Sequence, residues 1–178
     1  MERKYVILVN EHDEEMGKAE KLAAHQKGLL HRAFSVFIFR THADQLELLM
    51  QQRHPAKYHC GGLWTNTCCS HQQPGEETMA AGKARLQEEM GFSVDLTYAG
   101  HFMYKAAFDN GLTEHEYDHV LVGYYDGNID QYNRDEVAQA LWVSLEALNR
   151  WNKEQPHILT PWFLPALHIA QQALNRYN

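Results

Sequence analysis

The stretch around which this sequence is organised is Gly61-Gly-Leu-Trp-Thr-Asn-Thr-Cys-Cys-Ser-His71. If its second half is extended, successive side chains alternate between two faces. Cys69 and His71 then share one face, while Asn66 and Cys68 point to the other. Two residues of a strand span about 7 Å. The stretch therefore predicts a thiol and an imidazole in the wall of one pocket.

Composition and net charge limit the classes of ligand that this pocket can bind. The chain has 178 residues, of which 44% are hydrophobic and 22% are charged, as in an ordinary globular protein. This length predicts one domain over residues 1–178 with a core of its own. The net charge of -7 argues against general binding to nucleic acid or to a membrane surface. A local basic pocket remains compatible with it.

The cysteines and the N-terminus indicate a cytoplasmic protein. Three cysteines, two of them adjacent, do not make a disulfide framework, and a reducing compartment suits them. The apolar run Tyr5–Val9 is too short for a signal peptide core or a membrane span. Twelve histidines are unusual and raise the expectation of a metal site.

The hydrophobic pattern alternates between short strands and a few helices. The Asn110-Gly111 pair is a strong hairpin signal, and Ser144 is suited to cap a helix that begins at Leu145. Strands are expected over 5–9, 32–39, 45–52, 92–96, 98–108, 112–125 and 139–143. Helices are expected over 76–91, from residue 145, and after Thr160-Pro161-Trp162.

Two groups of candidate metal ligands each have an ordinary alternative. His25 and His31 flank a glycine, which places them on a loop, where they could be exposed or capped histidines. Glu114 and Glu116 share a face of the strand 112–125 with Asp118. Two carboxylates so close repel unless a cation lies between them. The alternative is an acidic strand that faces water.

Candidate anion-binding residues are also open to two interpretations. Arg53 and Lys57 belong to a short basic loop that leads into the organising stretch. They are either solvated charges or side chains that bind an anion in the pocket. Arg85 and Glu89 lie four residues apart on one face of the helix 76–91, as either a structural i, i+4 salt bridge or two side chains of the pocket.

Taken together, three imidazoles and two carboxylates suit Mn²⁺, Zn²⁺ or Mg²⁺ better than Ca²⁺. The segments that carry these residues resemble the type 1 isopentenyl-diphosphate delta-isomerases in order and spacing along nearly the whole chain. The most specific of them is Trp64-Thr-Asn-Thr-Cys-Cys-Ser-His71. The others are Leu22-Ala-Ala-His25, Leu30-His-Arg-Ala-Phe-Ser35, Glu114-His-Glu116 and Thr160-Pro-Trp162.

The resemblance implies a Nudix-like α/β/α sandwich with a mixed β-sheet, an α/β (α+β) fold. The helix 76–91 falls at the position of the Nudix box, but its hydrolytic pattern is degraded. The opening glycine is replaced by Ser70, and Ala84-Arg85 stands where the box has Arg-Glu. This departure weakens a diphosphate hydrolase and suits an enzyme that leaves the diphosphate intact.

The resemblance also implies a role for each site residue. Cys69 and Glu116 would transfer protons, with Tyr104 assisting Glu116 and Trp162 forming an aromatic wall. One divalent metal would bind to the imidazoles and carboxylates, and Mg²⁺ would accompany the diphosphate of the substrate. The metal ligands would be His25, His31, His71, Glu114 and Glu116. The second ion would bind to Glu89 and the Cys69 carbonyl, and the diphosphate to Lys21, Arg53, Lys57 and Arg85.

The expected activity is a metal-dependent, flavin-independent interconversion of isopentenyl and dimethylallyl diphosphate in isoprenoid biosynthesis, by a monomer or weak dimer. A tertiary carbocation requires water exclusion, proton-transfer groups and an aromatic face. The alternatives are a Nudix-type diphosphate hydrolase and a non-catalytic metal-binding module. A flavin enzyme is disfavoured because a glycine-rich phosphate loop is missing from the sequence.

Overall fold

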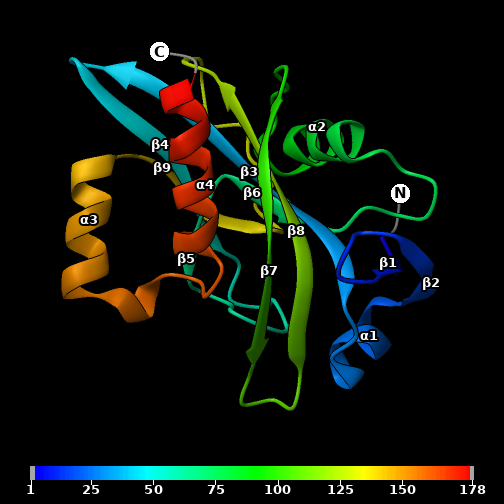
Figure 1. Cartoon of the computed structure of the whole chain (residues 1–178). Helices are drawn as coiled ribbons and strands as arrows, with labels where there is room; N and C mark the ends of the chain where they lie inside the picture. The colour runs from blue at the N-terminus through cyan, green and yellow to red at the C-terminus, as the bar shows by residue number, and fades with distance from the viewer. Residues whose placement is uncertain (1–2, 177–178) are drawn as a thin grey trace.

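A computed structural model describes residues 3–176 of the chain (Figure 1). These residues form one nine-stranded sheet and several helices. The strands are β1 (Tyr5–Val9), β2 (Glu15–Glu20), β3 (His31–His42), β4 (Gln45–Arg53), β5 (Trp64–Thr65), β6 (Cys68–Ser70), β7 (Thr97–Ala107), β8 (Thr113–Tyr124) and β9 (Val137–Ser144). The helices are α1 (Lys21–Lys27), α2 (Thr78–Met90), α3 (Leu145–Glu154), the 3-10 turn η1 (Pro156–Ile158) and α4 (Phe163–Arg176).

Strand β3 lies at the centre of the sheet and makes it mixed. It pairs in parallel with β8 and antiparallel with β1, β4 and β6. On its far side β8 forms the expected hairpin with β7, whose turn contains Gly111 at a φ of 80°. A glycine tolerates this left-handed conformation without strain. The predicted mixed sheet and α+β class are confirmed.

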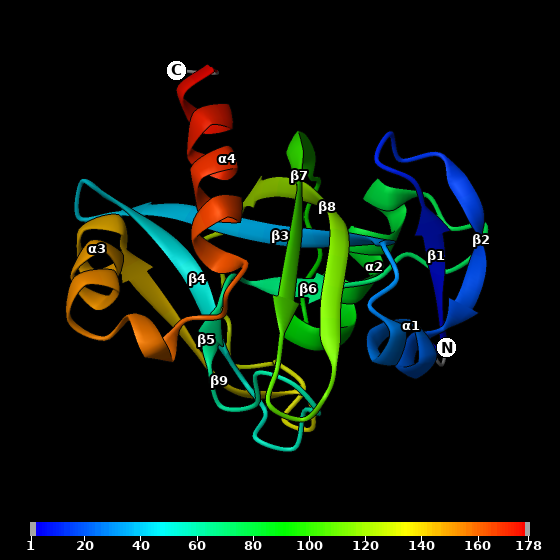
Figure 2. The same cartoon turned by 60° about the horizontal axis from the view of Figure 1, so that its bottom comes forward.

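Alternation along the central strands produces two hydrophobic cores. Phe37 and Phe39 of β3 face the first core, where they pack with Phe163 of α4. Val36 and Ile38 face the second core, where they pack with Leu86 of α2. Both figures show strands of the sheet between α2 and α4 (Figures 1 and 2). Since successive residues of a strand point to opposite faces, this pattern produces the expected α/β/α layering.

Most predicted elements are present, but two expectations are wrong. Residues 92–96 form no strand, because Gly91 turns the chain and Phe92 stacks on Tyr125 with ring centroids 3.8 Å apart. His25 and His31 do not lie on a loop, since His25 belongs to α1 and His31 begins β3. Both imidazoles are fully buried, so the interpretation as exposed histidines is wrong.

The helices begin where side chains can cap them. Helix α2 starts at Thr78, two residues later than expected, because the Glu77 carboxylate accepts hydrogen bonds from the main-chain N–H groups of Met79 and Ala80. The Ser144 hydroxyl accepts one from Ala147 at the start of α3, as predicted. Such caps satisfy N–H groups that have no partner within the helix. None of the helices within residues 3–176 has the length and apolar character needed to cross a membrane.

Replacing Gly91 by alanine is expected to destabilise the fold strongly. Gly91 has a φ of 80°, and an added Cβ would meet the Gln131 carbonyl oxygen at 2.3 Å. A non-glycine residue pays about 1–2 kcal/mol for this conformation, and the steric overlap adds about 1–3 kcal/mol. Gly75→Ala is the matched control, because Gly75 has a φ of 81° and open space around it. Denaturant unfolding of both variants measures the difference, and equal losses would contradict the steric part.

Candidate active site

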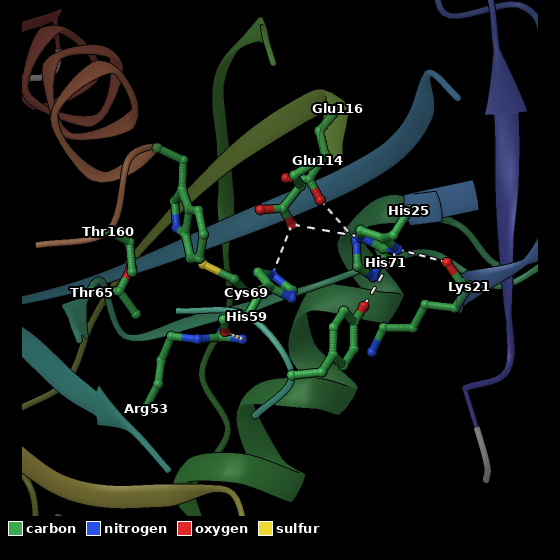
Figure 3. Close-up of polar contacts among 12 residues, drawn as sticks. Lys21, His25, Arg53, His59, Thr65, Cys69, His71, Glu114, Glu116 and Thr160 are labelled. Carbon is green, nitrogen blue, oxygen red and sulfur yellow. Dashed lines mark hydrogen bonds and ion pairs between the residues drawn. The ribbon is translucent and has the colours of Figure 1, made fainter. Parts of the chain in front are cut away.

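A cavity of about 320 Å³ opens where β3, β6 and β8 meet the loop between β4 and β5. Its size suits a small ligand. Imidazoles, carboxylates and a thiol line the cavity together with cationic side chains, of which Figure 3 shows Lys21 and Arg53. The lining residues are Arg3, Lys21, Phe34, Arg53, Lys57, Tyr58, His59, Cys69, Ser70, His71, Arg85, Glu89, Glu114, Glu116, Asp118, Glu136 and Trp162.

Strand pairing brings the five candidate metal ligands together. His31 of β3 is the register partner of Glu116 on the parallel strand β8. His25 comes from α1, and His71 follows β6 directly. Ligand atoms of the three histidines lie within 4.8 Å of one another, as do those of His71 and the two glutamates. The structure therefore contains a His/Glu group that could bind a divalent metal.

The hydrogen bonds of His25 and His31 determine which ring nitrogen is free. The Nδ1 atom of His25 is 2.6 Å from the Lys21 carbonyl, and that of His31 is 2.8 Å from the Leu29 carbonyl. A carbonyl only accepts, so Nδ1 carries the proton in both rings. The two Nε2 atoms are buried without a hydrogen-bond partner. Free Nε2 lone pairs backed by Nδ1–H bonds are the arrangement of histidines that bind metals.

Glu114 and Glu116 share one face of β8, and only 3% and 5% of their surfaces are exposed. The alternative of an acidic strand facing water is therefore wrong. The Glu116 Oε2 atom is 2.8 Å from Nε2 of His71 and 3.6 Å from Nε2 of His31. Glu114 Oε1 is 3.9 Å from Nε2 of His25. The donor set is thus imidazole nitrogen and carboxyl oxygen, which fits Mn²⁺, Zn²⁺ or Mg²⁺.

The pKa values of the two glutamates are shifted in opposite directions. Burial tends to raise the pKa of Glu114, but the neighbouring imidazoles of His25 and His59 and the Tyr104 hydroxyl hold it well below its ordinary range. Burial, followed by the Glu114 charge, raises the pKa of Glu116 well above its ordinary range. Burial also lowers the pKa of His31 to about 4. Glu114 therefore ionises more readily than Glu116, and the His31 imidazole is neutral at pH 7.

The register of β6 separates the two adjacent cysteines. Cys69 pairs with Ser35 of β3 and lines the cavity, with its Sγ 3.2 Å from Oδ1 of Asn66. Cys68 faces the second core and points its Sγ at Glu89, 2.8 Å away. The predicted orientation of the cysteines is confirmed. Asn66 does not follow the alternation, because residues 66–67 interrupt the extended chain between β5 and β6.

The Cys69 thiol has polar neighbours, with its Sγ 3.6 Å from Oγ of Ser35 and 3.2 Å from Oδ1 of Asn66. Burial raises the pKa of Cys69 to about 12, and the nearby Asp118 carboxylate contributes in the same direction. Asn66 Oδ1 also accepts a hydrogen bond from Nε1 of the buried Trp162, at 3.3 Å. One amide therefore connects the thiol to the aromatic wall. A protonated thiol in such a place is suited to moving a proton rather than to nucleophilic attack.

Tyr104 contacts the carboxylates from the neighbouring strand β7. It is the register partner of Glu116, but its hydroxyl donates a hydrogen bond to Oε2 of Glu114. Its ring centroid is 6.2 Å from that of Trp162. The sequence predicted that Tyr104 assists Glu116, whereas its direct partner in the structure is Glu114.

The four predicted diphosphate-binding cations all line the cavity. Burial, followed by the charges of Lys57 and Arg53, lowers the pKa of Lys21. Like charges this close favour an anion among them. The Arg85 guanidinium is 3.6 Å from Glu89. Both readings of that pair hold, since it forms an i, i+4 salt bridge and also lines the cavity.

Several lining residues were missed by sequence reasoning. Asp118 could have been included, because it continues the face of Glu114 and Glu116. His59, Tyr58 and Glu136 lie in loops, where no periodicity indicates direction. Glu136 is 2.6 Å from Nη2 of Arg85 and 3.9 Å from Nζ of Lys57. The sequence around it contains only turn signals.

Comparisons with known proteins agree with this geometry. The NUDIX domain model matches residues 29–163. The crystal structure of the Deinococcus radiodurans protein DR0079 has a TM-score of 0.71 at 16% identity, covering 94% of this chain and 98% of that one. The MutT protein of Methanosarcina mazei Go1 has a TM-score of 0.62 at 16% identity, covering 80% and 94%. At these identities the likeness shows the fold, and the chain has a NUDIX domain.

Closer relatives define the family. Isopentenyl-diphosphate Delta-isomerase 2 of Aromatoleum aromaticum is 46% identical over 172 residues, covering 96% of this chain and 89% of the relative. The isomerase of Serratia proteamaculans is 46% identical over 159 residues, covering 89% and 87%. That of Burkholderia multivorans is 43% identical over 171 residues. The chain belongs to the isopentenyl-diphosphate Delta-isomerase family, as its segments indicated.

Proposed function

We propose that this protein interconverts isopentenyl diphosphate and dimethylallyl diphosphate. The observation that carries the proposal is the composition of one cavity. Cys69 and Glu116, from different strands, line it beside the buried Trp162, and four cationic side chains line the same cavity. Proton-transfer groups, an aromatic face and an anion site are the three requirements of this isomerisation. The names of the relatives support the same activity.

The reaction moves protons and leaves the electron count of the substrate unchanged. One proton is added to the terminal alkene carbon, which places the cation on the internal alkene carbon. Another proton then leaves the CH2 group beside that cation on the diphosphate side, and the new double bond forms there. Cys69 and Glu116 are the groups that hold these two protons. The Trp162 face stabilises the intermediate tertiary cation by about 0.5–2 kcal/mol. Because no redox step occurs, a flavin is not required.

The divalent metal would bind to five side chains. These are His25, His31, His71, Glu114 and Glu116. The free Nε2 atoms of the first two histidines support this assignment. When bound, the metal offsets the repulsion between two buried carboxylates and polarises the groups that it contacts. Mn²⁺, Zn²⁺ and Mg²⁺ are the candidates.

The diphosphate would be held by the cationic side chains that line the cavity. Lys21, Arg53, Lys57 and Arg85 supply four positive charges. The Glu89 carboxylate and the Cys69 carbonyl are the proposed ligands of an Mg²⁺ that accompanies the substrate. Oxygen ligands shared between protein and phosphate are typical of Mg²⁺.

The decisive experiment is an assay of the purified protein with isopentenyl diphosphate and Mg²⁺ or Mn²⁺. Formation of dimethylallyl diphosphate without a reducing cofactor is the expected result. Release of phosphate without isomerisation would overturn the proposal in favour of a diphosphate hydrolase. Arg85 stands where the Nudix box has a glutamate, which weakens the hydrolase alternative, although Glu88, Glu89 and Gly91 of the box remain.

Arg85→Gln is expected to raise the KM for isopentenyl diphosphate by about 10- to 100-fold, the value of a charge-assisted hydrogen bond. The effect on kcat should be smaller, because Arg85 binds the diphosphate rather than the reacting carbons. Steady-state kinetics at saturating metal measure both constants. Lys83→Gln removes an exposed charge from the same helix. Nζ of Lys83 is 3.2 Å from Oδ1 of Asp95. This control should keep the wild-type KM, and an equal rise in both variants would contradict the assignment.

We further propose a single domain over residues 1–178 that acts in the cytoplasm as a monomer or weak dimer. Both hydrophobic cores share one sheet, which supports a single cooperative unit. The three cysteines are free, as suits a reducing compartment.

A further inference from the structure

His59 lies in the loop between β4 and β5 and faces the candidate metal site. Only 7% of its surface is exposed, and its ring lines the cavity. Its Nε2 atom is 3.2 Å from Oε1 of Glu114 (Figure 3). His59 belongs to neither of the His/Glu groups whose ligand atoms lie within 4.8 Å of one another. His59 therefore contacts the candidate ligand Glu114 without being one of the candidate ligands itself.

The two oxygens of Glu114 receive hydrogen bonds from two different elements. Oε1 faces Nε2 of His59, and Oε2 accepts from the Tyr104 hydroxyl of β7. A glutamate side chain has several rotatable bonds, and one contact leaves its carboxylate free to turn. Donors on both oxygens fix the plane of the carboxylate. This orientation keeps Oε1 on the side of His25 Nε2, at 3.9 Å.

The imidazole of His59 is held by packing. Its ring centroid is 4.6 Å from that of Tyr58, 5.4 Å from that of Phe108 and 6.3 Å from that of Trp162. The Arg53 guanidinium donates a hydrogen bond to the His59 carbonyl at 3.3 Å. The Nδ1 atom is buried without a partner. The carboxylate accepts from Nε2–H, so the ring acts as a rigid single donor.

We propose that His59 is a positioning residue that orients Glu114 for divalent metal binding by donating its Nε2–H to Oε1. The proposal rests on the metal site described under the proposed function. Donors behind a metal ligand fix its orientation, and their loss costs about 10–100-fold in metal affinity. The residue acts before any substrate is bound, so its effect appears in metal binding itself.

Two substitutions distinguish the hydrogen-bond donor of His59 from the packing of its ring. His59→Phe keeps an aromatic ring in the packed position and removes the donor. His59→Gln restores an N–H near the position of Nε2. Zn²⁺ and Mn²⁺ affinities of the metal-free protein are measured by competition with a chromophoric chelator. We expect His59→Phe to weaken binding about 10–100-fold and His59→Gln to recover most of the loss.

The controls distinguish this role from a change of the loop or of the fold. His54→Ala alters the same loop, where His54 Nδ1 accepts a hydrogen bond from the Ala56 main chain, and it should keep wild-type metal affinity. Circular dichroism of each metal-free variant checks folding. Unchanged affinity in a folded His59→Phe variant overturns the proposal. An equal loss in His59→Gln also overturns it, because His59 would then be a ligand itself.

Metal binding by the wild-type protein distinguishes a wrong metal site from a wrong role for His59. If the wild-type protein binds neither metal, the metal site itself is wrong and the role of His59 falls with it. If the wild type binds metal and isomerises its substrate while His59→Phe binds equally well, only the role of His59 is wrong.

Discussion

Replacing Cys69 by alanine is expected to lower kcat by about 10²- to 10⁴-fold, the usual contribution of a positioned acid or base. The reason is geometric, because the Cys69 thiol lines the cavity beside Trp162. Cys68 has the same chemistry but faces the second core and contacts Glu89. Cys68→Ala should therefore keep most of the activity and lose some stability instead. Conversion of isopentenyl diphosphate at saturating substrate measures the effect.

The pair of variants is its own control, since both remove one thiol from adjacent positions of the same strand. Thermal unfolding shows whether either variant has lost its fold. An equal loss of kcat in two folded variants would mean that the thiol facing the cavity is not the proton-transfer group. Cys69→Ser should recover little activity, because a hydroxyl is a much weaker acid than a thiol.

Removing one imidazole from the metal site is expected to have the second large effect. His31 is fully buried, and its free Nε2 lies 3.6 Å from Glu116. His31→Asn shortens the side chain, so its amide no longer reaches the position of Nε2. Metal content should fall from about one ion per chain to a small fraction, and activity by about 100-fold or more, exceeding the loss of a supporting hydrogen bond. Elemental analysis of the dialysed protein and the isomerase assay measure the two effects.

Chelation of the wild-type protein should reproduce the loss of activity, and added Mn²⁺, Zn²⁺ or Mg²⁺ should reverse it. His168→Asn is the control, because His168 lies on α4 and bonds only with Gln172 among the contacts described for it. A His31→Asn variant that retains full metal content would exclude His31 as a ligand. A wild-type protein that stays active after complete metal removal would exclude the metal from the reaction.

Local features of the fold were readable in the sequence. Alternation and turn chemistry predicted the hairpin at Asn110-Gly111 and the cap at Ser144, and both are present. The same alternation placed Glu114 and Glu116 on one face and turned Cys68 away from Cys69. These features depend on residues close to one another in the chain, where the period of a strand decides orientation.

The assembly of the site required the tertiary structure. His31 and Glu116 are neighbours only because β3 and β8 pair in parallel, and no local pattern specifies that pairing. Burial also depended on the tertiary structure, since the local pattern left His25 open between an exposed or capped histidine and a metal ligand, and the fold buries it. The resemblance to known isomerases joined these residues in advance, because it carries information from whole folded proteins.

The loop residues of the site are those that the sequence pattern predicts least. His59 and Glu136 have no periodic neighbours, so their directions depend on packing between distant elements. The sequence by itself determined most of the strands, the orientation of Cys69 and the types of reactive group available. The tertiary structure decided which of those groups share one cavity, which imidazole nitrogens are free and which donors hold Glu114. The physical reason is that side-chain period is a local property, whereas burial and strand pairing are properties of the whole chain.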